Sequence, residues 1–535
     1  MNRVERAMTC ESAGPMLRLR GAWQARAARW PAMLLGSALT LSACTAVGPD
    51  FVRPEAKVSP AWAEKDSAAL TTKTAADSAW WKTFNDPTLD KLIELAYKQN
   101  LSLQIAGLRI LEARAQLGYA TGQQYPQVQL ATASATAVGV SKNSASYIPG
   151  FDTRFADYQV GFDAAWEMDF WGKYRRGVES ETAALAGSVA DYDNALVALT
   201  AEVARTYAVV RTFEVLLEQA RTNADLQAEG LRIADARFHH GATSELDVTQ
   251  ATALLESTRA TIPKLEASLQ QSENALSTLL GQPTGSVRDM LGGPKDIPAA
   301  PVQVAVSIPA EMLRRRPDIR SAEQFAAAQS ARIGIAKADL YPSFSLVGSV
   351  GLQTSSSVSG HSTGSLFDTD SLTYLFGPRI TWSIFNYGRT RNLIRIQDAR
   401  FQQLIVNYQD TVLRAAQEVE DNMIGFLNSQ LATESETRAV AAAQKSVDLA
   451  FSQYREGATD YERVLDAQRT LLQQQNTLAQ TRSSVATSLI ALYKALGGGW
   501  EMRIGQPIVP QTMQDQMQQR TEWNGYFSPA PAPTR

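Results

Sequence analysis

The sequence predicts a mainly α-helical protein with a membrane β-barrel portion, built from two copies of one structural unit. Three observations predict this fold class. The chain of 535 residues repeats its pattern at an offset of 216 residues, each copy contains a very long stretch poor in glycine and proline, and each copy contains two short segments that alternate between apolar and polar residues. The second pattern is typical of helices, and the third is typical of strands with one apolar face.

Composition excludes several functional classes. The 51 Lys and Arg residues against 54 Asp and Glu residues give no electrostatic case for binding nucleic acid. No uninterrupted apolar run reaches the roughly 18 residues that a spanning helix requires. Two cysteines and three histidines leave little for disulfide frameworks or metal sites, and there is no Walker A motif. We therefore expect no enzyme, no metal site and no bound cofactor.

The N-terminus has the pattern of an export signal followed by a lipid anchor. A basic segment precedes the short apolar run 30–41, which is too short to span a membrane. The run ends in Leu41-Ser-Ala-Cys44, which resembles a bacterial lipobox. That resemblance implies that residues 1–43 are removed and that Cys44 carries S-diacylglycerol and an N-acyl chain. The alternative is a chance cysteine after an ordinary signal peptide.

Two terminal segments flank the repeated unit. Residues 44–79 contain Pro49, Pro54 and Pro60 and are interpreted as a lipid-anchored extended tether. Residues 504–535 form a C-terminal tail, which we expect to be flexible or loosely docked.

The internal repeat divides the rest of the chain. Glycine, tyrosine and proline residues recur at the same offset: Tyr125-Pro126 as Tyr341-Pro342, and Leu280-Gly281 as Leu496-Gly497. The first repeat covers residues 80–281, a connector covers 282–308, and the second repeat covers 309–503.

Each copy has the same predicted order of elements. A helix (about 101–122 and 318–340) leads through Tyr-Pro into a pair of strands. A long helix follows (about 172–239 and 388–456), then a Gly-Ala-Thr turn and a returning helix of about 35 residues. At 1.5 Å per residue each long helix is roughly 100 Å, which favours coiled-coil-like packing.

The strands carry the membrane prediction. Every even position is apolar in 158–170 and again in 374–384, whereas the first strands of each pair, about 127–138 and 343–352, alternate more weakly. Strands of about 10 residues with one apolar and one polar face are typical of transmembrane barrels. The alternative for any single strand is a soluble β-sandwich.

Four strands cannot close a barrel by themselves. Open sheet edges are not tolerated in lipid, and the smallest familiar barrels use about eight strands. The chain is therefore expected to share strands with copies of itself.

These features together resemble the outer-membrane factor (TolC-like) family, and within it the OprM/NodT-type efflux lipoproteins. The resemblance rests on the lipobox, the paired strands, the repeat, the Gly-Ala-Thr turns and the closing Leu496-Gly-Gly-Gly-Trp500, and it covers about residues 41–503. It implies a homotrimer with a 12-stranded barrel in the outer membrane of a Gram-negative bacterium and an α-helical tunnel in the periplasm. It also implies a passive exit duct for drugs or small toxic solutes, with a periplasmic membrane-fusion adaptor and an inner-membrane RND pump as partners.

The resemblance also implies functional residues at the two helical turns. The family's pore-constricting acidic residue corresponds to Asp466, with Tyr454, Glu462 and Asp247 as further gate positions. Arg463 stands where TolC has a second acidic residue, so a double acidic ring is not implied. The residues that the family presents to its adaptor are Gly241, Ala242, Thr243, Gly457, Ala458 and Thr459.

Simpler interpretations exist for each of these residues. Ser244 followed by Asp247 fits a local helix cap, Asp460 is a capping candidate for the second returning helix, and Asp466 fits a solvated helix face. Glycine at a helix end is ordinary turn chemistry. For the whole protein, the alternatives are the exit duct of a metal-ion or type I protein exporter, and a structural coiled-coil lipoprotein without a pore.

Overall fold

The computed structural model describes residues 46–64, 67, 70–71, 77–145, 147–150, 152–301, 303–305, 315–356 and 363–530. The predicted signal peptide and Cys44 lie outside the described residues. The chain forms two compact units, a sheet unit around residues 126–175 and 337–386 and a helical unit containing 48–125, 176–336 and 387–530. No helix in the described part of the chain combines the length and apolarity that crossing a membrane requires.

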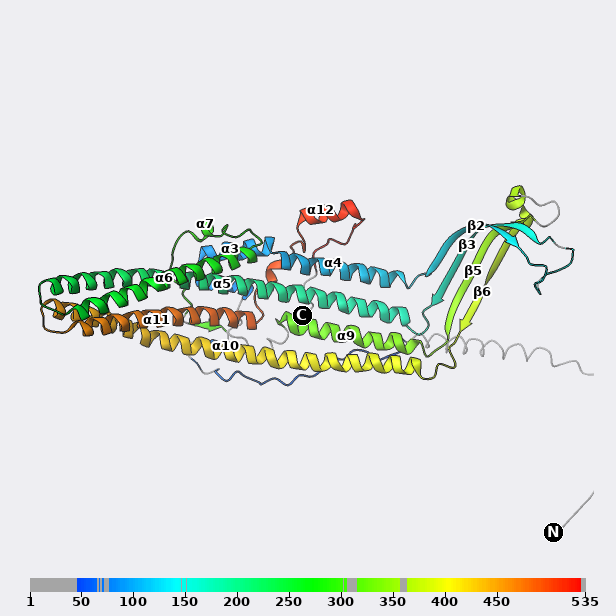
Figure 1. The fold of residues 1–535 in the computed structure, drawn as a ribbon. Helices are drawn as coiled ribbons and strands as arrows, with labels where there is room; N and C mark the ends of the chain where they lie inside the picture. Colours follow the sequence, from blue (N-terminus) through cyan, green and yellow to red (C-terminus); the bar gives the residue numbers. More distant parts are fainter. Residues whose placement is uncertain are drawn as a thin grey trace, which may run out of the picture. The chain divides into compact units, whose positions relative to one another are not determined.

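The sheet unit contains one four-stranded antiparallel sheet (Figure 1). Its order is β2 (Val128–Gly139), β3 (Arg154–Met168), β5 (Ser343–Ser355) and β6 (Leu372–Thr381), with short turns of 3-10 helix at Thr363–Phe367 and Thr369–Ser371. Each repeat supplies one hairpin, and the pairing of β3 with β5 joins the two. The four predicted strands are therefore present.

The strand register places most of the large apolar residues of β3, β5 and β6 on one face, although Leu130 and Leu375 lie on the other. Phe162 lies opposite Val350, which lies opposite Tyr374. The neighbouring row on the other face contains Asp163 and Ser349. The weak alternation of β2 is explained by its composition, because its apolar-face positions 131, 133, 135 and 137 are all alanine.

The sheet has two unpaired edges. Within the described residues, β2 pairs only with β3, and β6 pairs only with β5. β6 ends at Thr381, three residues before the predicted end, because its partner β5 begins at Ser343. The indole N–H of Trp382 instead donates to the carbonyl oxygen of Leu340, with an N···O distance of 3.0 Å.

The helical unit repeats its long elements with equal lengths. α5 (Lys173–His239) and α10 (Arg389–Arg455) each have 67 residues, and α6 (Glu245–Leu279) and α11 (Tyr461–Ala495) each have 35. α4 (Leu101–Gly122) and α9 (Pro317–Ala338) each have 22. The remaining elements of the described residues are η1 (Asp77–Phe84), α3 (Pro87–Gln99), α7 (Arg288–Leu291), η4 (Trp500–Arg503), α12 (Gln511–Arg520) and the parallel pair β1 (Leu70–Thr71) with β4 (Val304–Ala305).

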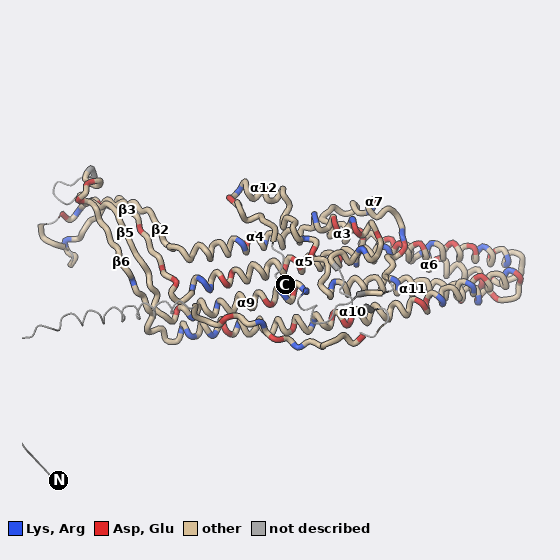
Figure 2. The backbone as a smooth tube through the Cα atoms, turned by 180° about the vertical axis from the view of Figure 1, so that it is seen from behind, with Lys and Arg blue, Asp and Glu red and all other residues tan. Residues whose placement is uncertain are grey.

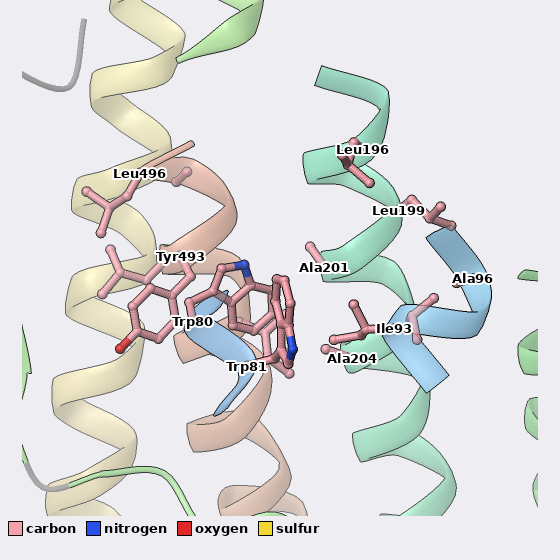
Figure 3. Close-up of a cluster of buried hydrophobic side chains, with 14 of the residues drawn as sticks. Trp80, Trp81, Ile93, Ala96, Leu196, Leu199, Ala201, Ala204, Tyr493 and Leu496 are labelled. Carbon is pink, nitrogen blue, oxygen red and sulfur yellow. The ribbon is translucent and has the colours of Figure 1, made fainter. Parts of the chain in front are cut away.

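The large core of the helical unit forms where both repeats meet η1 and α3. Trp80 stacks on Tyr493 with a ring-centroid distance of 5.4 Å and meets Trp81 edge to face. Figure 3 shows these rings beside Ile93 and Ala204. Burying such large aromatic surfaces contributes about 1.5–3 kcal/mol per side chain. The core therefore packs η1 and α3 against helices of both repeats.

The C-terminal tail is docked on the helical unit over its described length. It contains α12, and the side chain of Met517 is buried. The Arg114 guanidinium donates to the carbonyl oxygen of Ser528 at 2.6 Å, and Arg503 donates to that of Ala530 at 3.2 Å. Of the two expectations for the tail, flexible or loosely docked, these contacts agree with the docked one, and composition does not reveal the distant arginines that hold it.

The N-terminal segment 46–64 contains no helix or strand and is held by ion pairs. Asp50 pairs with Arg176 at 2.7 Å, and Arg53 pairs with Glu323 at 2.5 Å. Further along the segment, the N–H of Ala63 donates to Glu420 at 2.9 Å. This segment is therefore fastened to helices of both repeats.

Candidate functional site: the helical turns

Two helical turns lie at the same end of the helical unit, one between α5 and α6 and one between α10 and α11 (Figure 1). Both use glycine in the left-handed region, with φ of 72° at Gly241 and 77° at Gly457. A side chain there would be strained, because L-residues rarely adopt this conformation. The predicted turns are thus present in both copies.

The backbone hydrogen bonds of the two turns match one another. The N–H of Gly241 donates to Phe238 at 2.9 Å, and the N–H of Ala242 donates to Arg237 at 2.8 Å. In the second turn, Gly457 donates to Tyr454 at 3.0 Å, and Ala458 donates to Gln453 at 2.8 Å. This pattern satisfies the last carbonyls of each long helix, so the glycine residues have a structural role.

The predicted side-chain caps are absent. Ser244 and Asp460 occupy the N-cap positions of α6 and α11, but neither side chain makes a capping hydrogen bond. The Asp247 carboxylate instead accepts from the hydroxyl of Thr243 and from that of Tyr454, the latter at 3.3 Å. The Asp247 carboxylate therefore has one partner on its own turn, Thr243, and one on the other hairpin, Tyr454.

Tyr454 links the two hairpins. Its side chain is 1% exposed, and its ring lies 5.0 Å from that of Tyr461. The Arg237 guanidinium lies 4.5 Å from the Tyr454 ring centroid and donates to the Tyr454 carbonyl oxygen. A cation over an aromatic ring contributes about 0.5–2 kcal/mol. We call this set of Arg237, Thr243, Asp247 and Tyr454 the tip contact.

Burial and charge keep the two tyrosines neutral. Burial raises the pKa of Tyr454, the Asp247 carboxylate raises it further, and the Arg237 guanidinium acts in the opposite direction. Burial also raises the pKa of Tyr461. Both hydroxyls therefore keep their protons at physiological pH, and Tyr454 remains a donor to Asp247.

An apolar cluster packs behind the tip contact. It takes residues from all four helices of the two hairpins, including Ile233, Leu254, Val447 and Leu465. Because nonpolar burial is not directional, this cluster holds the hairpins together, while the tip contact fixes which residues face one another.

The predicted gate carboxylates on α11 lie apart from the tip contact. Asp466 and Glu462 are exposed, whereas Val464 and Leu465 between them are buried. Within the described residues, neither carboxylate has a hydrogen-bond or ion-pair partner in the protomer. Figure 2 shows further acidic and basic residues toward this end of the helices. The structure therefore brings Tyr454 and Asp247 together, and it places Asp466 and Glu462 on a solvent-facing side.

Sequence reasoning missed Arg237. The only signal was a basic residue in the last turn of α5, at a position that is Gln453 in the second copy. Its partner is 217 positions away in the chain, so no local pattern could reveal the contact.

These features define an envelope channel protein. They are the paired long helical hairpins, the amphipathic sheet with two unpaired edges and the repeated glycine turn. A family model described as outer membrane efflux protein matches residues 92–282 and again 308–498. The two matched ranges are offset by 216 residues, as the internal repeat predicts. The chain belongs to this family, and it is an outer-membrane efflux channel.

Curated relatives match over nearly their whole length. The probable outer membrane lipoprotein SilC of Salmonella typhimurium is 31% identical over 86% of this chain and 96% of its own. Nodulation protein T of Rhizobium leguminosarum bv. trifolii is 30% identical over the same shares. The cation efflux system protein CusC of Escherichia coli is 30% identical over 87% of this chain and 97% of its own.

Solved structures confirm the fold. The outer-membrane channel OprN superposes with a TM-score of 0.78 at 31% identity and covers 85% of this chain and 99% of its own. The open state of the MtrE channel of Neisseria gonorrhoeae gives a TM-score of 0.72 at 27% identity, with coverage of 85% and 99%. The predicted family, fold class and outer-membrane location are therefore confirmed.

Proposed function

We propose that the protein is the trimeric exit duct of a tripartite efflux system, passing drugs or small toxic solutes from the periplasm to the exterior. A periplasmic membrane-fusion adaptor and an inner-membrane RND pump would complete the system. The observation that carries the proposal is the four-stranded sheet with one apolar face and two unpaired edges. Such a sheet is stable in lipid only if its edges pair with other copies.

Trimer closure supplies the missing pairing. The β6 edge of one copy would pair with the β2 edge of the next, so three copies close a ring without leaving an edge. The same symmetry would place three α5–α6 and three α10–α11 turns around one axis. The turn residues Gly241–Thr243 and Gly457–Thr459 would then meet the adaptor.

The α11 carboxylates are suited to a ring at the narrow end of the duct. Threefold symmetry would bring three Asp466 carboxylates toward one axis, with Glu462 one helical turn away. Like charges at close range repel unless they are protonated, bridged by cations or held by donors. Such a closed aperture has modest stability, and the tip contact would hold it closed until a partner rearranges the turns.

Asp466→Ala tests the gate. We expect the resting conductance of purified trimers in planar bilayers to rise, because the substitution removes the ring of carboxylates. The matched control is Glu434→Ala, which removes an exposed carboxylate of α10 outside the turn. Conductance no higher than that of wild type would remove Asp466 from the gate.

Lipidation of Cys44 forms part of the proposal. The lipobox-like segment supports S-diacylglycerol and N-acyl chains at this residue, and no other prosthetic group is proposed. Acyl chains contribute about 0.8 kcal/mol per buried CH₂, so they would anchor the mature N-terminus in the outer membrane.

A susceptibility profile tests which class of solute the channel carries. A deletion strain would be compared with the same strain carrying the wild-type protein, across drugs, detergents and copper or silver salts. Sensitivity to organic compounds that the wild-type protein reverses supports small-molecule efflux. Sensitivity confined to metal salts would favour the alternative, the exit duct of a metal-ion exporter. The similarity to a cation efflux protein is the reason for testing these salts.

A further inference from the structure

The apolar face of the four-stranded sheet has a hollow in it. The floor forms where Ala164 of β3 lies opposite Gly348 of β5, and Ala131 of β2 adds a third small residue. Larger apolar side chains surround this floor on the same face, in the rows on either side and on β6; they are Phe162, Val350, Trp166, Leu346, Tyr374 and Phe376. We call this recess the sheet hollow.

The sheet does not explain why Gly348 lacks a side chain. A Cβ at this position would lie 3.4 Å from the Phe376 ring, which is an ordinary contact, so space within the sheet does not require glycine. Glycine inside a strand weakens the strand, and it often marks a place where a ligand approaches closely. The missing side chain therefore points to an occupant that packs on the sheet from outside.

The sheet hollow suits hydrocarbon rather than a charged solute. Asp163 lies between the rows, but its side chain belongs to the opposite face, where the carboxylate accepts from the Thr132 hydroxyl at 3.4 Å. At the rim, the Gln129 side-chain amide donates to the carbonyl oxygen of Pro126 at 3.2 Å. An alkyl chain would contact apolar side chains on this face and would leave water, which is favourable.

The N-terminal segment meets the sheet unit where β3 ends. The backbone N–H of Val47 donates to the carbonyl oxygen of Trp171 at 2.9 Å. Ala46 lies against Gly172, and any side chain at Gly172 would collide with it. These contacts fix the position of Ala46, and Cys44 is only two residues earlier in the chain.

Aromatic residues at this end of the sheet are typical of a membrane boundary. Trp171 stacks on Tyr341 with a ring-centroid distance of 4.6 Å, and its indole N–H donates to the carbonyl oxygen of Pro342 at 2.8 Å. Tryptophan and tyrosine are enriched at the level of the lipid headgroups, where one side of the ring is apolar and the other is wet. A lipid attached two residues before Ala46 would therefore enter the hydrocarbon layer at this level.

The distance from this boundary to the sheet hollow matches the length of an acyl chain. Ala164 lies four residues before Met168, the last residue of β3, which corresponds to about 13 Å along the strand. The hydrocarbon of one leaflet is about 15 Å thick, which is half of the bilayer core. An acyl chain that follows the sheet from its end therefore reaches the hollow.

We infer that an acyl chain of the Cys44 lipid lies in the sheet hollow, so that each protomer's anchor packs on its own sheet. The inference rests on the proposed function, of which the lipidation of Cys44 is a part. The contacts of Ala46 and Val47 hold the attached chain beside this face, so it loses less freedom on binding than a free phospholipid does.

Native mass spectrometry of purified trimers tests this occupant, because it counts the phospholipids that remain bound. Cys44→Ser trimers, expressed behind a cleavable signal peptide, should retain more phospholipid than wild type, up to one molecule for each vacated hollow. Adding Ala164→Leu fills the hollow and should abolish this gain. Adding Ala156→Leu, on the same face of β3 but outside the hollow, should leave the gain intact.

Equal phospholipid content in wild-type and Cys44→Ser trimers would overturn the inference, because the attached lipid would then not compete for the hollow. A gain that persists with Ala164→Leu would overturn it as well, since the additional lipid would lie elsewhere.

Photocrosslinking carries the test with Cys44 intact, in case Cys44→Ser trimers do not assemble. A p-benzoylphenylalanine in place of Leu346, in the wall of the hollow, should crosslink to the N-terminal lipopeptide under ultraviolet light. The control places the same residue at Leu372, an exposed position on the same face of β6 outside the hollow. Crosslinks from Leu346 to phospholipid alone, or equal lipopeptide yields at the two positions, would overturn the inference.

The intact mass of the wild-type protein separates this inference from the proposal beneath it. A mass without acyl chains would contradict the lipidation of Cys44 itself. A lipidated protein whose trimers form no conducting pore would contradict the proposed exit duct, whatever occupies the sheet hollow.

Discussion

At the residue scale, Asp193 shows how a buried charge is held in this fold. Its side chain is fully buried, and its carboxylate receives Arg503 in two contacts, one of 3.0 Å, and Arg320 in one of 2.7 Å. The two arginines also lie near the Trp500 ring, with centroid distances of 4.7 Å for Arg320 and 5.9 Å for Arg503. One carboxylate thus connects α5, α9 and η4.

Asp193→Asn should be strongly destabilising. The substitution keeps the shape of the side chain but leaves two arginines without their counter-charge, and breaking a buried pair in this way costs about 3–5 kcal/mol. We expect a clear fall in the thermal midpoint measured by circular dichroism in detergent. Glu202→Gln, which breaks the exposed pair with Arg205, is the control and should cost about 0–1 kcal/mol. Equal effects of the two substitutions would contradict the structural role of Asp193.

The proposed role of the tip contact predicts that the closed channel is sensitive to alkaline pH through Tyr454. Its pKa and that of Tyr461 are raised by burial above the ordinary value of about 10. The folded state therefore favours the neutral hydroxyl, and this contribution is complete below about pH 10 and is lost as pH rises through the raised pKa. We expect resting conductance to increase above about pH 10.

Tyr454→Phe separates this effect from general alkaline unfolding. The variant lacks the hydrogen bond to Asp247, so it should conduct more at neutral pH and show a smaller alkaline increase. Tyr119→Phe, at a residue whose side chain is 72% exposed, should behave as wild type. An unchanged neutral-pH conductance in Tyr454→Phe would show that the tip contact does not hold the closed state.

The sequence could indicate some site residues and not others. Asp466 lies two helical turns beyond the N-cap, so its exposed position and lack of a capping role follow from local spacing. The contact between Tyr454 and Asp247 joins residues 207 positions apart, and only the family resemblance placed them together. Local spacing indicated a cap at Ser244 and Asp247, but it could not show that the Asp247 carboxylate also reaches Tyr454.

At the element scale, the strands were predictable because side chains alternate between two faces of a sheet. Their partners were not predictable from alternation alone. β2 carries small alanines on its apolar face, and only the register with β3 shows which of its two faces is apolar. Strand ends likewise depend on where the partner begins, as the early end of β6 shows.

The two faces of the sheet should respond differently to a charge. Val350→Arg places a cation on the apolar face, which costs about 2–4 kcal/mol near the middle of a membrane. Ser349→Arg places the same cation one residue away on the polar face. We expect the first variant to lose heat-resistant trimers on gels and the second to keep them. The reverse order would mean that the apolar face does not meet lipid.

At the scale of the whole molecule, the two repeats keep equal helix lengths but differ at their turns. Phe238 in the first copy is partly exposed, whereas Tyr454 at the matching position of the second is buried against the other hairpin. At the preceding position the difference is reversed, because Arg237 of the first copy contacts the other hairpin whereas Gln453 of the second is exposed. Equal lengths keep the turns at one end of the unit, and the differences give each turn its own contacts, which a repeat pattern alone does not predict.

Insertion and lipid anchoring should be separable. The apolar sheet face supplies its own membrane affinity, while segment 46–64 is held by the Asp50–Arg176 and Arg53–Glu323 ion pairs without help from the lipid. Cys44→Ser, expressed behind a cleavable signal peptide, should therefore lose labelling by palmitate yet still form heat-resistant trimers in the outer membrane. Membrane fractionation and gel mobility measure both properties in one preparation. Persistent labelling would place the lipid elsewhere, whereas loss of trimers would show that the acyl chains, and not the strand faces, drive insertion.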